Sequence, residues 1–198
     1  FTIFENIRYI DESLILWRSS SQWVGGLYFL FSIVLLIDIF DNNLKKSVTN
    51  FLSFDTSETL KQSFKILFLY VFLTFGIFII FYFVNIRSFI SFNLALTLIS
   101  SGGFLPTDNL EGILNTNIKE IIFSFTMLVS FFSIFLSYNL IFIKDKNMNF
   151  FQEDIYLFFY LIFIVILFFL LFNVNYNFST IFLSLTSSIS NIGLSLDN

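Results

Sequence analysis

The sequence has no cysteine, no histidine and a single proline, and only seven of its 198 residues are glycine. Without cysteine, disulfide bonds and thiolate metal sites are excluded, and the chain carries no signal for a redox compartment. Without histidine, it has no imidazole for base catalysis, a proton relay or metal binding. The few residues that break regular structure therefore stand out, above all Gly102, Gly103 and Pro106.

Charge is also scarce, because only 12% of the residues are Asp, Glu, Lys or Arg. Soluble domains carry roughly 25%. The chain is 57% hydrophobic and 22% aromatic, and its mean hydropathy is +0.85. This composition predicts an integral membrane protein in contact with the lipid bilayer. A net charge of −4 and a pI near 4.6 argue against a nucleic acid as partner.

Four apolar runs are each about one bilayer thickness long when helical. They are Trp23–Phe40, Ile66–Val84, Ile121–Ile143 and Ile155–Phe172. We expect residues 1–22 to form an interfacial connector, with Trp17 and Trp23 at the level of the lipid headgroups. Gly25 and Gly26 predict a close approach of another backbone. Lys45 and Lys46 are predicted to anchor the cytoplasmic end of the first span.

Two further apolar runs, Ser88–Ile99 and Phe178–Ile189, are too short to span a bilayer. Each leads into a turn that contains glycine, Ser100–Asp108 and Ser190–Asp197 respectively. Non-helical backbone at membrane depth is tolerated only where protein buries it or where it lines a water-filled cavity. The pattern therefore predicts an all-α membrane protein with four transmembrane helices and two re-entrant pore loops. The alternative is that the turns are ordinary exposed membrane loops.

The predicted orientation follows from the basic residues near the ends of the spans. If both turns face outward, more Lys and Arg residues lie inside than outside, in agreement with the positive-inside rule. We expect Leu105–Glu120 to be an exposed loop. The basic residues predicted inside are Lys45, Lys46, Lys61, Lys65, Lys144 and Lys146, and those predicted outside are Arg8, Arg18, Arg87 and Lys119.

Three stretches resemble the Trk/Ktr/HKT potassium transporters, and among them the pore-forming TrkH-type subunits. Trp17–Gly26 reads Trp-Arg-Ser-Ser-Ser-Gln-Trp-Val-Gly-Gly and is similar to the signature that opens the second helix of the first pore repeat. Ser91–Ala95, followed by Ser101-Gly102-Gly103-Phe104 and Asp108, resembles the pore helix and filter of the second repeat. Thr186–Asp197 is similar, less closely, to a third filter.

The resemblance implies four pseudo-repeats of helix, pore loop and helix around one pore. It divides this chain into the end of a first repeat (residues 1–60), a complete second repeat (61–150) and the start of a third (151–198). We expect a fragment of a longer subunit whose gate lies elsewhere. Asn191-Ile192-Gly193-Leu194 departs from the usual third filter toward a fourth-repeat style, although the chain order favours the third.

The resemblance further implies potassium uptake across the cytoplasmic membrane by a multi-pass protein. The expected partners are a second copy of the full-length subunit and a cytosolic nucleotide-binding regulatory subunit. Potassium is the transported ion, and we expect neither a resident cofactor nor a catalytic residue. Filter carbonyls replace the ion's hydration shell, and glycine permits the required backbone. The predicted filter residues are Ser101, Gly102, Gly103, Phe104, Asn191, Ile192, Gly193 and Leu194.

Side chains around these turns have predicted supporting roles. Ser100, Ser187 and Ser188 are expected to hydrogen-bond the filter backbone from behind. Asp108 and Asp197 are expected to raise the local cation concentration at the outer mouth, although solvated loop charges are the plainer interpretation of both.

Other functions remain open at this stage. A secondary transporter with broken helices is disfavoured because Ile66–Val84, Ile121–Ile143 and Ile155–Phe172 contain no charged residue. An intramembrane enzyme would need a nucleophile with a base, or a carboxylate pair, at membrane depth. A non-catalytic membrane scaffold is the third alternative.

Overall fold

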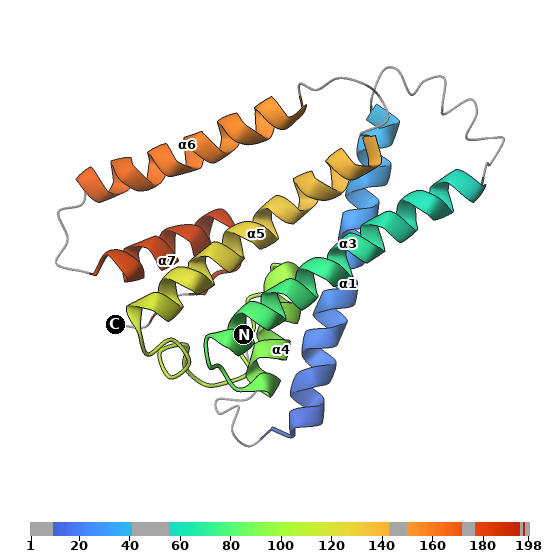
Figure 1. Cartoon of the computed structure of the whole chain (residues 1–198). Coiled ribbons are helices and arrows are strands. Elements are labelled where there is room, and N and C mark those ends of the chain that lie inside the picture. Colours follow the sequence, from blue (N-terminus) through green and yellow to red (C-terminus); the bar gives the residue numbers. More distant parts are fainter. Residues whose placement is uncertain (1–9, 41–55, 143–149, 172–176, 195, 197–198) are drawn as a thin grey trace.

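The computed structural model describes residues 10–40, 56–142, 150–171, 177–194 and 196. These residues form six α-helices and no β-strand (Figure 1). The predicted all-α class is thus confirmed for this part of the chain. The helices are α1 (Glu12–Phe40), α3 (Thr56–Phe83), α4 (Ser88–Ile99), α5 (Asn117–Phe142), α6 (Phe150–Leu171) and α7 (Phe178–Ile189).

One helix among the described residues is long and apolar enough to cross a membrane. This is the Ser63–Phe83 part of α3, which has 21 residues and a mean hydropathy of 2.6. Phe68, Phe72 and Phe75 on this helix are more than half exposed, so much of its apolar surface is not covered by the rest of the chain. Helices α1, α5 and α6 overlap the other three predicted spans, and their crossing of a membrane stays a prediction.

The short helix α4 is the centre of the packing. It contacts α1, α3 and α5, which are all longer and surround it in Figure 1. Every residue from Asn93 to Ile99 is buried, and Leu94, Ala95 and Leu98 have no exposed surface. A mostly apolar helix is stable where other elements cover it, and here the three longer helices cover most of α4, apart from exposed residues such as Phe92.

Helix α5 connects the two halves of the bundle. It packs against α3 and α4 on one side and against α7 on the other. The rings of Phe81 on α3 and Phe123 on α5 stack with centroids 5.5 Å apart, and Phe125 on α5 lies 5.6 Å from Phe182 on α7. Both short helices, α4 and α7, are therefore held against the same longer helix. Helix α6 contacts α7 at the edge of the bundle.

The structure adds detail to one predicted connecting segment and corrects another. Helix α1 begins at Glu12, so much of the predicted interfacial connector is helical. The Trp23 indole N–H donates to the Thr74 hydroxyl (2.9 Å), near the middle of Ser63–Phe83, and this bond between α1 and α3 satisfies the partly buried indole. The position of Trp17 and Trp23 among lipid headgroups stays a prediction.

The segment Leu105–Glu120, predicted to be exposed, is also partly buried. Leu110, Ile113 and Leu114 are each at most 7% exposed. They form a turn in which the Ile113 and Leu114 N–H groups donate to the Leu110 carbonyl at 3.0 and 2.9 Å. These apolar side chains fold back onto the core because exposure to water would be unfavourable. Predictions for Lys45, Lys46, Lys144, Lys146 and Asp197 fall outside the described residues.

Candidate functional site

Two similar turns follow the two short helices. We call residues 100–105 the first glycine loop and residues 190–194 the second glycine loop. The first continues from α4 and the second from α7, and each of these helices has 12 residues. The prediction of a short helix followed by a glycine turn is therefore confirmed at both places, whereas their entry into a membrane stays a prediction.

The two loops share one backbone pattern. Ser100 and Ser190 have negative φ angles of −87° and −79°. The next residues, Ser101 and Asn191, have positive φ angles of 51° and 55°. Gly102 and Ile192, which follow them, do not have positive φ angles. Gly103 and Gly193 again have positive φ angles, of 66° and 72°. Apart from Asn85, no other described residue has a positive φ. The loops thus leave their helices by the same path.

Hydrogen bonds to the preceding helix explain how each loop begins. The Ser101 and Gly102 N–H groups donate to the Leu98 and Thr97 carbonyls at 3.0 and 2.8 Å. In the second loop, the corresponding N–H groups of residues 191 and 192 donate to the carbonyls of residues 188 and 187 at 3.3 and 3.2 Å. This is the Schellman arrangement, in which a left-handed residue lets the helix end satisfy its own carbonyls.

The same bonds affect the charge that each loop presents. Consecutive free N–H groups in alternating conformations form a nest for anions. Here the first N–H groups of each loop are already used by the helix end. Helix C-termini carry partial negative charge, and neither α4 nor α7 has a basic residue in its last turn to offset it. The helix ends alone therefore favour a cation at both loops, while the Arg18 guanidinium adds a positive charge at the Phe104–Leu105 end of the first loop.

The two loops touch through their backbones. A Cβ atom built on Gly103 would lie 1.9 Å from the Ile192 carbonyl oxygen, which is far inside van der Waals contact. Only glycine allows this approach, and its positive φ independently disfavours any other residue. The first and second glycine loops, which are far apart in the sequence, therefore form one continuous feature of the fold.

The predicted filter residues differ in their surroundings. Ser101, Asn191 and Gly193 are exposed, whereas Ile192 and Leu194 are buried. The Phe104 ring is 38% exposed, and the Gly102 carbonyl accepts a long hydrogen bond from the Gln22 side chain (3.5 Å). The structure thus brings both predicted sets of residues together, with the Gly102 carbonyl directed toward α1.

The predicted serine supports are wrong in two cases. The Ser100 hydroxyl donates to the Leu96 and Thr97 carbonyls of its own helix (2.9 and 3.1 Å). Likewise, Ser188 donates to the Ser184 carbonyl (2.9 Å). Short hydroxyl side chains near a helix end readily bond the preceding turn, and this competes with any bond to the loop.

Support for the first glycine loop comes instead from α1, which sequence reasoning missed. The Arg18 guanidinium donates through Nη2 to the Leu105 carbonyl (2.9 Å) and lies over the Phe104 ring, 4.5 Å from its centroid. Burial lowers the pKa of Arg18 below its ordinary value, yet an arginine stays protonated in proteins. The available signal was the Trp17–Gly26 stretch, in which Arg18, Gln22 and Gly26 lie one helical turn apart.

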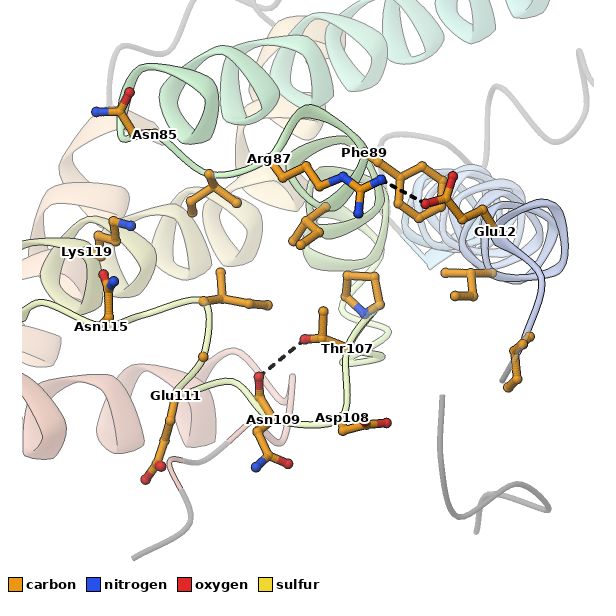
Figure 2. A pocket seen from close by; sticks show the side chains of 17 residues that line it. Glu12, Asn85, Arg87, Phe89, Thr107, Asp108, Asn109, Glu111, Asn115 and Lys119 are labelled. Carbon is orange, nitrogen blue, oxygen red and sulfur yellow. Dashed lines mark hydrogen bonds and ion pairs between the residues drawn. The ribbon is translucent and has the colours of Figure 1, made fainter. Parts of the chain in front are cut away.

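A pocket of about 730 Å³ opens beside the segment that follows the first glycine loop. Figure 2 shows its polar lining, in which Arg87 pairs with Glu12 at 3.0 Å. Asp108 is half-buried and Glu111 is exposed, and both line the pocket together with Arg87 and Lys119. Acidic and basic groups therefore share this surface, and the predicted cation-attracting role of Asp108 stays a prediction.

Comparison with known proteins adds no relative, because no family model, curated protein or solved structure matches the chain.

Proposed function

We propose that the chain carries potassium across the cytoplasmic membrane along a path formed by the two glycine loops. The observation that carries the proposal is the pairing of these loops: they share one backbone conformation and meet at Gly103 and the Ile192 carbonyl. Each loop also lies at the C-terminus of a short helix, where partial negative charge favours a cation. The resemblance to the Trk/Ktr/HKT transporters supports the same assignment.

The chemistry required of such a path is modest. A potassium ion that leaves water must find oxygen atoms at the same distances, and backbone carbonyls supply them without a full negative charge. The N–H groups at the start of each loop are held by the helix ends. The proposed ligands are the carbonyls of residues 101–104 and 191–194, of which the Gly102 carbonyl also accepts the Gln22 amide (3.5 Å).

The membrane arrangement is part of the same proposal. Four helices (α1, α3, α5 and α6) would span the bilayer, while α4 and α7 enter it only part of the way. Residues 61–150 then form one whole repeat, flanked by parts of two others. A second copy of the subunit and a cytosolic nucleotide-binding regulator are the partners that the resemblance implies.

Radioactive rubidium uptake by the full chain, in bacteria that lack their own potassium uptake systems, tests this function. We expect Gly103→Ala to abolish uptake, because the new Cβ would collide with the Ile192 carbonyl. Gly25→Ala is the matched control, since a Cβ at Gly25 meets no atom within 4 Å. The amount of each variant in the membrane fraction must be equal.

Two results would contradict the proposal. The first is a wild-type chain that raises rubidium uptake no further than an empty vector does. The second is Gly103→Ala protein that reaches the membrane in normal amount and still discriminates between rubidium and sodium as the wild type does.

A further inference from the structure

A row of three residues on α1 follows the first glycine loop along its length. Arg18, Gln22 and Gly26 are each four positions apart, so they lie on one face of the helix. Arg18 contacts Phe104 and Leu105, Gln22 contacts Gly102, and Gly26 lies against Ser100. The row therefore runs in the opposite direction to the loop. Each step of one helical turn along α1 corresponds to a step of roughly two residues back along the loop.

Arg18 makes the most specific contact in this row. Its Nη2 donates to the Leu105 carbonyl at 2.9 Å, while the guanidinium lies 4.5 Å from the centroid of the Phe104 ring. A planar guanidinium can donate along its edge and stack through its face at the same time. Two consecutive residues of the loop are thereby fixed to one side chain of α1.

The rest of the row determines how closely α1 approaches the loop. A Cβ on Gly102 would lie 2.7 Å from the Gln22 Cδ, and a Cβ on Gly26 would lie 2.9 Å from the Ser100 Cα. Both glycines thus sit at van der Waals distance from the opposite element. The carbonyl of Gly102 also accepts the Gln22 amide at 3.5 Å. The beginning and middle of the loop are held by packing, and its end is held by Arg18.

We propose that Arg18 is a positioning residue that sets the ion preference of the first glycine loop. This inference rests on the proposed transport function. Carbonyls that must distinguish two cations of different size need a defined spacing. The bonds from the loop to its own helix end stop at Gly102. The Phe104–Leu105 end is held by Arg18 and by the packing of Leu105 against the core. When Arg18 is lost, the loop keeps its bonds to the end of α4, but the positions of the Phe104 and Leu105 backbone are no longer fixed by α1.

The test compares rubidium and sodium uptake by the full chain carrying Arg18→Gln, Arg18→Lys or Arg87→Gln. We expect Arg18→Gln to lower the rubidium-to-sodium uptake ratio by about tenfold, because a hydrogen bond to a charged group is lost. Arg18→Lys keeps the charge but not the planar contact, so we expect most of the same loss. Arg87→Gln removes an exposed ion pair with Glu12 and should leave the ratio unchanged.

The outcomes separate this inference from the proposed function. Absence of uptake by the wild type overturns the transport function itself. Transport by the wild type together with an unchanged ratio in Arg18→Gln overturns only the role of Arg18. A normal ratio in Arg18→Lys would show that a charged donor to the Leu105 carbonyl is enough, and would overturn the part of the inference that rests on the planar contact with Phe104.

If Arg18→Gln fails to accumulate in the membrane, Phe104→Leu supplies the test. This change removes the ring beneath the guanidinium and keeps the Leu105 carbonyl. We expect a smaller fall in the ratio, in the same direction. Where Arg18→Gln does accumulate, the double variant with Phe104→Leu adds a second test, because effects that merely add would contradict a shared contact.

Discussion

At the scale of single residues, Gly103 and Gly193 hold the same backbone conformation for different reasons. Both have positive φ angles, of 66° and 72°. A Cβ on Gly103 would meet the Ile192 carbonyl at 1.9 Å, whereas a Cβ on Gly193 would meet nothing within 4 Å. The first glycine is required by conformation and by contact, and the second by conformation alone.

This difference predicts two distinct patterns of substitution. Gly193→Ala should destabilise the fold by about 1–2 kcal/mol, the cost of a left-handed L-residue, and Gly193→Asn by less, because asparagine tolerates this region. At Gly103 both substitutions should cost more than at Gly193, because the collision remains with either side chain. Thermal unfolding of the detergent-purified chain measures these differences. Equal losses for Ala and Asn at Gly193 would argue against the assigned conformation.

The glycine positions could be predicted from sequence because turn chemistry is local. Gly102-Gly103 and Gly193 each follow an apolar run and mark its end. The contact between Gly103 and Ile192 could not be predicted in this way, since nothing in either turn specifies the other as its neighbour. The role of Arg18 was missed for the same reason, because its partners lie 86 and 87 positions further along the chain.

At the scale of the helices, α1 is attached to α3 and α4 through a small set of contacts. The Trp23 indole donates to the Thr74 hydroxyl (2.9 Å), and the Tyr70 hydroxyl donates to the Trp23 carbonyl (3.2 Å). Gly26 leaves room for Tyr70, whose hydroxyl would lie 2.6 Å from a Cβ at that position. The close approach predicted for the glycine pair is thus confirmed for Gly26, whereas Gly25 faces open space.

The neighbouring glycines give an internally controlled prediction for this joint. Gly26→Ala should destabilise the chain by about 1–3 kcal/mol, as overpacking does in a well-packed interior. Gly25→Ala should be neutral or stabilising by up to about 1 kcal/mol, because alanine is the better helix former. Thermal unfolding of both variants under the same detergent conditions decides the matter. If Gly25→Ala were the more harmful change, the described packing of α1 would be wrong.

The limits of the two short helices were predictable because their signals lie next to one another in the chain. Ser88–Ile99 and Phe178–Ile189 are apolar runs with turn residues directly after them, and α4 and α7 have these bounds. The burial of Leu110, Ile113 and Leu114 depends on contacts with distant elements of the core. A segment of mixed polarity carries no local signal for such contacts, so the sequence predicted an exposed loop there.

At the scale of the whole molecule, much apolar surface is not covered by the described parts of the chain. Large aromatic side chains on α3 and α6 remain exposed, including Phe68, Phe72, Phe159 and Phe163. Soluble monomers rarely show contiguous apolar surface of this kind. The exposed surface of Ser63–Phe83, the helix with the length to cross a bilayer, is therefore the place where lipid contact can be tested directly.

Phe72→Asp provides that test, because Phe72 is 64% exposed and lies near the middle of Ser63–Phe83. In water, a surface substitution away from special features changes stability by no more than about 0.5 kcal/mol. In a bilayer, an aspartate at the helix centre costs about 2.5–3.5 kcal/mol. We therefore expect Phe72→Asp to lower the fraction of chain that stays in the membrane pellet after alkaline carbonate extraction, whereas Phe72→Leu should leave it unchanged. A Phe72→Asp chain that stays in the pellet as fully as the wild type would mean that this face does not contact lipid, and α3 would then need a protein partner to cover it.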